Sequence, residues 1–361
     1  MRVVLGIVAI VLSLLLVVGL HEAGHAVMAR LFKVKIKKIS IGFGRSLFSW
    51  QGKSGSEWVW AMWPLGGYVQ LLNSRIEPVP LSQDKFCFDK KSVWARGVIL
   101  LAGAFANISI AWIALVLMYT LGYQQTSPVI ETVVTPSVVA SAGLAAGDRM
   151  VSIDGETVAS WRAVGMRLIM TMGKSKVDVG VENETGVARH LTLDLSQWRY
   201  NRKNMSLLSA IGINPDLSPT NTHDVTPLPL LTACYHSILQ LIDLVGFFCI
   251  MLKQLFTGVI PFAALLGPLG LFSTMIDSFH QGLAMFLYFI ANLSLAVAFI
   301  NLFPIPGLDG GSIVYALVEK IRGKPVSVGM EVLLHRLVFI AFCLILVQLL
   351  LNDVQRYTSY G

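Results

Sequence analysis

The chain has 361 residues, of which 55% are hydrophobic and only 14% are charged, with 28 lysines and arginines against 21 acidic residues. This low charge excludes a disordered or nucleic-acid-binding chain, because both classes need far more charged residues. It also argues against an ordinary soluble enzyme, so the net charge of +7 calls for a membrane explanation. The four cysteines form no C-x-x-C pair, which argues against a disulfide framework and a thiolate metal site.

Four apolar runs are long enough to predict membrane-spanning helices, since crossing the hydrocarbon core takes about 20 helical residues. They cover approximately residues 3–20, 97–121, 282–303 and 337–351. A fifth apolar stretch, 228–256, is ambiguous because it contains several polar side chains.

The distribution of basic residues sets the orientation of these spans. Residues 30–96 carry twelve lysines and arginines and four acidic residues, whereas residues 122–227 carry nine lysines and arginines and ten acidic residues. We therefore expect 30–96 and 311–334 on the cytoplasmic side and 122–227 outside. Segment 228–281 must then begin and end outside, either as an outer amphipathic helix or as two further crossings. Prolines and glycines in 258–277 favour the first, and hence four spans rather than six.

The first span leads directly into the motif His21-Glu22-Ala23-Gly24-His25. Residues four apart lie on one face of a helix, so both imidazoles can reach one zinc ion, and Glu22 can take a proton from a zinc-bound water. The alternative is a set of polar residues at a membrane edge that only form hydrogen bonds. Ionisable residues continuous with an apolar run are costly, which favours the functional interpretation.

The segment 31–96 is too long for an ordinary loop. Short strands are expected at 35–41, 46–50, 57–63 and 67–72, with breaks at 42–44 and 65–67. Four tryptophans and one tyrosine in these strands are typical of a sheet at the lipid headgroups. An open sheet edge there could bind an extended substrate, or the sheet could simply pack on the helices.

The second span contains one strongly polar residue, Asn107. Such a residue either holds helices together or lines a site, and the sequence favours neither.

The outer segment is expected to be a small β-rich domain. Strands are expected at 129–134, 147–158 with a turn at Asp154-Gly155, 177–181 and 187–195, with a helical turn at 141–144 and a helix at 161–172. Residues 142–155 resemble the core of a PDZ domain. Such domains bind peptides by strand addition, so we expect contact with a peptide or partner; a domain without a ligand is the alternative.

A zinc hydrolase needs three protein ligands and an open position for water, and no third histidine follows His25 at a suitable spacing. The best candidate is Asp309, in a segment with two prolines and three glycines directly after the third span. Irregular backbone at membrane depth is tolerated where it lines a site. The alternative is a helix-ending loop with a capping aspartate.

Seven motifs together resemble the site-2 protease family of intramembrane zinc metalloproteases, and within it the bacterial branch that regulates the sigma-E factor. They are found, in order, at 21–25, 42–45, 64–68, 91–96, 103–107, 267–270 and 301–311. The resemblance implies that His21, His25 and Asp309 bind Zn²⁺ and that Glu22 is the general base. It also implies that Asn107 and Asn301 lie near the active site. The residues implied to bind unwound substrate are Gly42, Phe43, Gly44, Pro64, Leu65, Gly66, Gly67 and Tyr68.

The expected fold class is an α-helical polytopic membrane protein with about four spans, a membrane-associated cytoplasmic β-sheet and one extracytoplasmic PDZ-like domain. Its parts are a first span with the histidine motif (1–30), a reentrant β segment (31–96), a second span (97–121), the PDZ-like domain (122–227), a surface helical region (228–281), a third span (282–311) and a cytoplasmic loop with the fourth span (312–361). The sigma-regulating relatives carry two tandem PDZ domains, and this sequence has room for one.

The resemblance implies a bacterial inner-membrane enzyme whose active site faces the cytoplasm. Its substrates would be single-span membrane proteins, such as anti-sigma factors, or remnant signal peptides. One rival is a membrane-anchored metalloprotease that cuts soluble substrates, which the burial of the motif disfavours. Another is a scaffold or transporter with structural zinc, which Glu22 and the absence of an internal sequence repeat disfavour.

Overall fold

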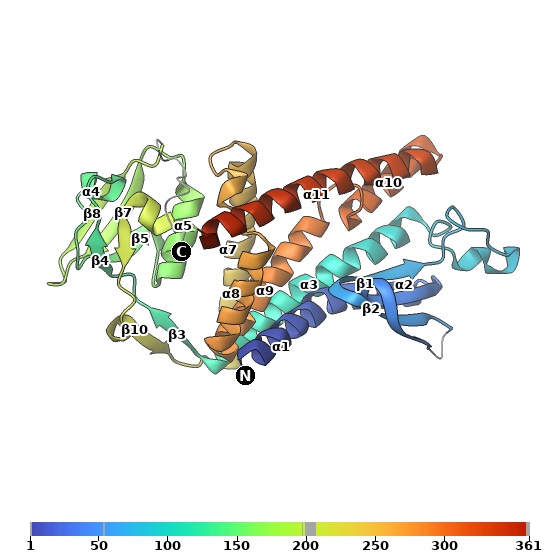
Figure 1. Ribbon diagram of the computed structural model, residues 1–361, viewed down its shortest axis with the longest axis horizontal. Helices are drawn as coiled ribbons and strands as arrows, with labels where there is room; N and C mark the ends of the chain where they lie inside the picture. The colour runs from blue at the N-terminus through green and yellow to red at the C-terminus, as the bar shows by residue number, and fades with distance from the viewer. Residues whose placement is uncertain (1, 53–54, 197, 199–206, 359–361) are drawn as a thin grey trace. The chain divides into compact units, whose positions relative to one another are not determined.

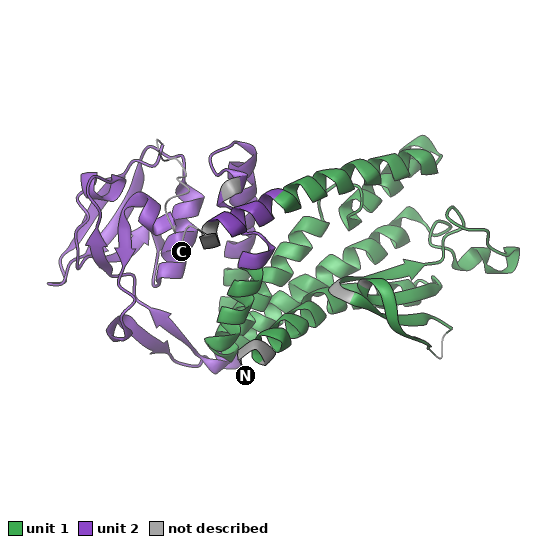
Figure 2. Cartoon of the chain, in the orientation of Figure 1, with its two compact units in different colours: residues 1–118, 234–241, 271–347 green, residues 119–233, 242–270, 348–361 purple. Residues whose placement is uncertain are grey.

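The computed structural model describes residues 2–52, 55–196, 198 and 207–358 (Figure 1). The chain divides into two compact units (Figure 2). The first unit comprises residues 1–118, 234–241 and 271–347, and the second comprises 119–233, 242–270 and 348–361. Each unit is described by itself.

Among the described residues, five helices are long and apolar enough to cross a membrane. They are Leu5–Leu31, Val93–Leu121 (α3), Leu230–Phe256 (α7), Leu283–Asn301 (α9) and Val328–Gln355 within α11 (Val328–Thr358). Four of these overlap the predicted spans, and the fifth, α7, is the stretch whose course the sequence left open. Length and composition alone thus give one candidate more than the four spans expected.

The first of these helices contains an irregular turn. It runs as α1 (Arg2–Leu14), a π-helical turn (Leu15–Gly19) and α2 (Leu20–Leu31). A π-helical turn accommodates one additional residue and is frequent at functional sites. This turn ends two residues before His21, so it rotates the face of α2 that carries the histidine motif.

A folded hairpin follows, made of β1 (Ile36–Gln51) and β2 (Glu57–Leu71). The first part of β1 pairs on both of its edges, because Ile39 lies opposite Val69 and also opposite Trp58. The second part of β1 pairs with the beginning of β2. The segments therefore lie side by side in the order 67–71, 36–41, 57–61 and 46–51, which leaves 67–71 as an edge.

The expected breaks in this sheet are wrong. The strands continue through both glycine-containing segments, and Phe43 pairs with Trp63 at that point. Gly42 and Gly44 have φ angles of 94° and 88°. Glycine adopts such angles without a steric penalty, so β1 bends there without ending. The four pairing segments that we expected are present, but they belong to two long strands.

Helix α10 (Asp309–Arg322) occupies a region for which we expected a loop, between the third and fourth spans. It is tied to α3 by Arg96, a buried side chain whose guanidinium lies 2.8 Å from the Glu319 carboxylate. The segment between the sheet and α3, which includes a 3-10 helix at Leu81–Phe86, is tied to α11 by the pair Arg75–Glu331 at 3.0 Å.

The second unit contains a β-rich domain with its own hydrophobic core. A four-stranded sheet has the order β6-β5-β7-β8, and two smaller strand pairs are β3–β10 and β4–β9. The strands are β3 (Tyr123–Thr126), β4 (Ile130–Val133), β5 (Arg149–Ile153), β6 (Glu156–Thr157), β7 (Val177–Glu182), β8 (Ala188–Leu193), β9 (Ile213–Pro215) and β10 (Thr222–Val225). The helices are α4 (Val138–Ser141), α5 (Trp161–Thr171) and α6 (Leu207–Ile211). The predicted strands are found, but the helical turn lies three residues earlier than expected.

The second half of α7 packs against α5 of this domain. The Asp243 carboxylate accepts two hydrogen bonds from Arg167, at 3.1 and 3.2 Å. Further along α7, the buried side chain of Gln254 donates to the carbonyl of Ile169 at 2.6 Å. These polar contacts fix this half of α7 to the surface of the β-rich domain.

The start of α8 (Pro268–His280) is capped by a buried acid. Asp353 is 1% exposed, and its carboxylate accepts hydrogen bonds from the backbone N–H groups of Gly267, Leu269 and Gly270 at 2.9–3.1 Å. A Cβ atom at Gly267 would lie 2.4 Å from this carboxylate. The Gly-Pro-x-Gly motif is therefore explained by helix capping.

Candidate metal centre

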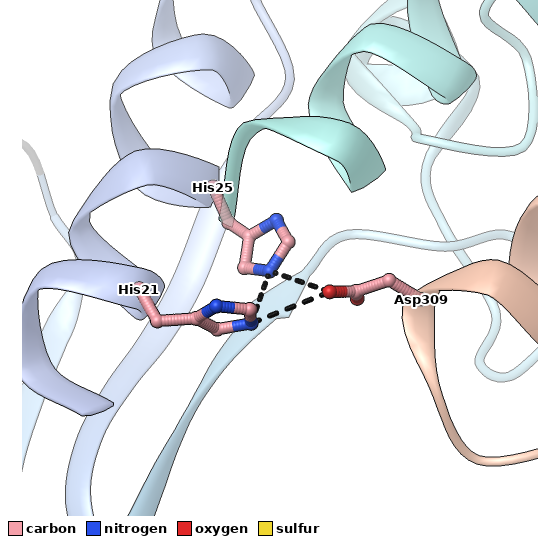
Figure 3. Close-up of side chains that lie close together, drawn as sticks. All are labelled: His21, His25 and Asp309. Carbon is pink, nitrogen blue, oxygen red and sulfur yellow. Dashed lines mark hydrogen bonds and ion pairs between the residues drawn. The ribbon is translucent and has the colours of Figure 1, made fainter. Parts of the chain in front are cut away.

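His21 and His25 lie one turn apart on α2, and both are buried. Their Nε2 atoms are 3.2 Å apart. Asp309 approaches from the start of α10, and its Oδ2 atom lies 3.3 Å from each Nε2 (Figure 3). The structure therefore brings together the three residues that the sequence proposed as metal ligands.

The position of Asp309 depends on the two glycines that follow it. A Cβ atom at Gly310 would lie 2.3 Å from the carbonyl oxygen of Phe303, and one at Gly311 would lie 2.1 Å from that of Ile305. Real Cβ atoms essentially never come so close, so only glycine lets the chain fold back tightly after α9. This local constraint explains the Asp-Gly-Gly sequence.

The spacing of the three atoms suits zinc. Donor atoms about 2.0–2.1 Å from a tetrahedral zinc ion lie about 3.3–3.4 Å from one another. The observed separations are 3.2, 3.3 and 3.3 Å. Two imidazoles and one carboxylate leave the fourth position open for water, which is the pattern of a catalytic rather than a structural site.

Hydrogen bonds of the histidines leave Nε2 as the ring atom available to a metal. The Nδ1 atom of His25 lies 2.8 Å from the carbonyl oxygen of Ile99, which can only accept, so Nδ1 carries the proton and Nε2 holds a lone pair. The Oδ2 atom of Asp309 is buried and has no hydrogen-bond partner among the described residues, although it lies 3.3 Å from each Nε2. A carboxylate oxygen thus faces imidazole lone pairs, and a cation between them would relieve their repulsion.

Asn107 contacts His21 from α3. It is fully buried, and its amide nitrogen lies 3.3 Å from Nδ1 of His21, while its amide oxygen has no hydrogen-bond partner among the described residues. Exchanging the two amide atoms lets the oxygen accept a hydrogen bond from the Nδ1–H group of His21. This orientation leaves Nε2 of His21 free for a metal, and Asn107 contacts this candidate ligand directly.

We expect Asn107→Ala to weaken zinc binding by about 10- to 100-fold, because the partner that orients His21 is lost. Competition with a fluorescent chelator measures the dissociation constant. Asn292→Ala is the control, since Asn292 lies on α9 and donates within its own helix to Tyr288. Equal zinc affinity in the two variants would show that Asn107 only packs between helices.

Gly103 lies against both candidate histidine ligands, although from the sequence it was only the first residue of the motif at 103–107. A Cβ atom there would lie 2.3 Å from Nε2 of His25 and 2.7 Å from Nε2 of His21. Because Gly103 has no side chain, both imidazoles can pack against α3 at this position. Nearby, a Cβ atom at Gly24 would lie 2.5 Å from the carbonyl oxygen of Ala102, so glycine also permits the close approach of α2 and α3.

Glu22 lies on α2, and its side chain faces the end of β2. The backbone N–H of Val69 donates to its carboxylate. A Cβ atom at Gly67 would lie 3.3 Å from Cγ of Glu22 and 2.8 Å from the carbonyl oxygen of Ser40. The edge segment of the sheet thus touches the side chain proposed as the general base.

A cavity of about 550 Å³ surrounds these residues. Its lining includes His21, Glu22, His25, Asn301 and Asp309, and the β2 residues Gly66, Gly67, Tyr68, Val69 and Leu71. Its described lining includes neither Gly42 nor Gly44, although the sequence grouped them with the substrate-binding residues. The side chains of Phe43, Pro64 and Leu65 lie outside what the structure describes. Asn301 also donates within α9 to the carbonyl of Val297 at 3.1 Å.

Comparison with known proteins gives a consistent result. The family described as "Peptidase family M50" matches residues 9–346. "Regulator of sigma E protease" of Haemophilus influenzae is 27% identical, covering 96% of this chain and 98% of the relative. "Protease RseP" of Yersinia pestis is 26% identical, covering 99% of this chain and 100% of the relative. "Putative zinc metalloprotease" of Vibrio cholerae is 26% identical, covering 88% and 91%. The Yersinia alignment runs over 451 positions, so that relative carries residues for which this chain has gaps.

Proposed function

The chain belongs to peptidase family M50, and we propose that it hydrolyses a peptide bond within or near the membrane-spanning segment of single-span membrane proteins. It is a multi-pass inner-membrane metalloprotease whose cofactor is zinc. The observation that carries the proposal is that the Asp309 carboxylate meets the imidazoles of His21 and His25 beside Glu22. These two histidines and Glu22 lie on a helix that is long and apolar enough to cross a membrane.

In the proposed mechanism, His21, His25 and Asp309 would hold the zinc ion. When bound, zinc polarises the scissile carbonyl and makes its water more acidic. Glu22 accepts a proton from the attacking water as the oxygen bonds to the carbonyl carbon. It then gives this proton to the leaving nitrogen as the C–N bond breaks. The N–H of Val69 holds the Glu22 carboxylate in place for both transfers.

The edge of the sheet supplies a surface for an extended substrate. The N–H of Leu72 donates to the carbonyl of Lys35, directly before β1, whereas the N–H of Val69 points away from β1 to Glu22. Because backbone groups alternate along a strand, the odd-numbered residues 67, 69 and 71 direct theirs away from β1. A substrate segment that pairs with this edge would present its carbonyls beside the metal ligands.

A spanning helix hides its carbonyls in backbone hydrogen bonds, so the substrate must unwind before it is cut. We expect a Gly-Pro pair inside the span of a reporter to raise its cleavage rate severalfold in proteoliposomes that contain zinc. The control reporter carries the pair outside the span. Equal cleavage of both reporters, or faster cleavage of a soluble peptide of the same sequence, would favour a membrane-anchored protease for soluble substrates.

We propose that the active site faces the cytoplasm, with residues 122–227 outside, and that α7 also lies outside without crossing. The contacts of Asp243 and Gln254 with α5 support this position for α7, because they join its second half to a domain with a polar surface. A crossing α7 would instead put Asp243 near the middle of the bilayer, at a substantial cost.

Labelling tests this topology. In a cysteine-free background, we expect Lys253→Cys on α7 to react with a membrane-impermeant maleimide added from outside, because all of α7 lies there. Lys174→Cys in the β-rich domain is the positive control, and Lys320→Cys on α10 is the cytoplasmic control. All three lysines are exposed. Protection of Lys253→Cys until the membrane is permeabilised would mean that α7 crosses.

We propose substrates such as anti-sigma factors or remnant signal peptides, because the Haemophilus relative is named for the sigma E system. The β-rich domain is proposed to be a single PDZ-like module that contacts a peptide or partner. The gaps in this chain relative to its Yersinia relative support one such module in place of two.

A further inference from the structure

A second cavity, of about 320 Å³, lies beside the metal-centre cavity. One wall is the helical segment from Val11 to Arg30, and the other is formed by β1 and β2. Most of its lining is apolar; the residues used below are Val11, Leu14, Trp58, Trp60 and Met62. We call it the side pocket. Its volume is at the lower end of the range for ligand pockets, which suits one or two side chains.

The side pocket and the metal-centre cavity share part of their lining. The common residues are Val18, Glu22, Gly66 and Gly67. Two consecutive glycines inside a strand weaken it, and they commonly mark a place where another backbone or a ligand approaches closely. At this junction, Gly66 and Gly67 line both spaces, and a Cβ atom at Gly67 would already lie 2.8 Å from the carbonyl oxygen of Ser40 and 3.3 Å from Cγ of Glu22.

We propose that the side pocket binds one large apolar side chain of the substrate, from the residue at or next to the scissile bond. This inference rests on the proposed function. An extended segment paired with residues 67–71 directs alternate side chains to opposite faces of the sheet. A side chain that passes over the two glycines reaches the pocket while its backbone stays beside Glu22. Contact with Glu22 distinguishes this occupant from a lipid chain, which would need no access to the catalytic residues.

The expected consequence is selectivity at one substrate position. A leucine, phenylalanine or methionine there is expected to give a kcat/KM about 10- to 100-fold above that of glycine or aspartate, as in other apolar specificity pockets. Trp58, Trp60 and Met62 would form the sheet side of the pocket, and Leu14 the helix side.

The test is cleavage of a reporter library by the full chain in proteoliposomes. The library varies each of the five residues on either side of the cut, and mass spectrometry locates the cut. Leu14→Trp fills the side pocket, and Val11→Phe is a milder filling variant in case the first does not fold. Leu12→Trp is the matched control, because Leu12 is exposed on the same helix and does not line the pocket. Bound zinc is measured in every variant.

We expect the wild type and Leu12→Trp to prefer a large apolar residue at one position. In Leu14→Trp, the preference at that position alone should shift to alanine or glycine, with bound zinc unchanged. A wild type without such a preference, or a preference that survives both filling variants, would overturn the proposal. A lipid that is released by Leu14→Trp while the cleavage profile stays the same would also overturn it. Failure of the wild type to cut any reporter would refute the proposed function itself, and the side-pocket proposal with it.

Discussion

Glu22→Gln is expected to lower the rate of reporter cleavage by about 10²- to 10⁴-fold while the protein retains one zinc ion. Glutamine has nearly the same shape as glutamate, so its side-chain oxygen can still accept the hydrogen bond from Val69. It cannot take a proton from water at neutral pH. The variant should therefore keep the fold and the metal ligands and lose only the proton transfer.

Two measurements make this result decisive, namely the single-turnover cleavage rate and the zinc content of the same sample. Glu57→Gln is the matched control. Glu57 stands at the start of β2, its side chain is 44% exposed, and its nearest cation is Lys38 at 3.8 Å. We expect this variant to cut at the wild-type rate. Retained cleavage by Glu22→Gln would mean that another group accepts the proton, and loss of zinc would mean that Glu22 acts through the metal site.

The three candidate ligands could be proposed from the sequence, the two histidines for local reasons. The two histidines are four residues apart on a helix, and this spacing alone puts both imidazoles on one side. Asp309 could be proposed because its loop contains prolines and glycines directly after an apolar run. Its contact with the histidines, 284 residues away from His25, followed from the expected orientation of the spans and from family resemblance.

Other features depended on tertiary contacts that no local pattern reveals. Gly103 is one of several glycines in apolar helices, and only the approach of two imidazoles distinguishes it from Gly97, which has nothing within 4 Å. The role of Asn107 was undecided for the same reason. In the sheet, glycines were read as breaks because they usually end strands, whereas at positions 42 and 44 they let β1 bend and continue.

Composition alone leaves the course of α7 open. Its mean hydropathy and its length satisfy the conditions for a membrane span. Its polar side chains are nevertheless used: Asp243 binds Arg167, and Gln254 binds backbone carbonyls at the end of α5. Partners for the polar residues of an apolar helix can be recognised only in the folded chain.

Gly103→Ala is expected to abolish both zinc binding at micromolar concentration and cleavage. The added methyl group would lie 2.3–2.7 Å from the two imidazoles, so at least one ring must move. Metal–ligand distances tolerate a change of only about 0.2 Å, which means that such a shift removes a ligand rather than stretching a bond. A moderate increase in zinc concentration should therefore not restore activity.

Gly97→Ala is the control for this prediction, because position 97 lies on the same helix and a Cβ atom there meets nothing within 4 Å. Replacing glycine by alanine inside a helix stabilises it by about 1 kcal/mol, so the control should be at least as stable as the wild type and fully active. Thermal unfolding of the zinc-free proteins separates the two effects. If Gly103→Ala folds without zinc but cannot bind it, the metal centre needs the space beside the imidazoles that the missing side chain of Gly103 leaves. Normal zinc binding by Gly103→Ala would instead show that the rings can rearrange, and that the close contact at Gly103 is not needed for the site.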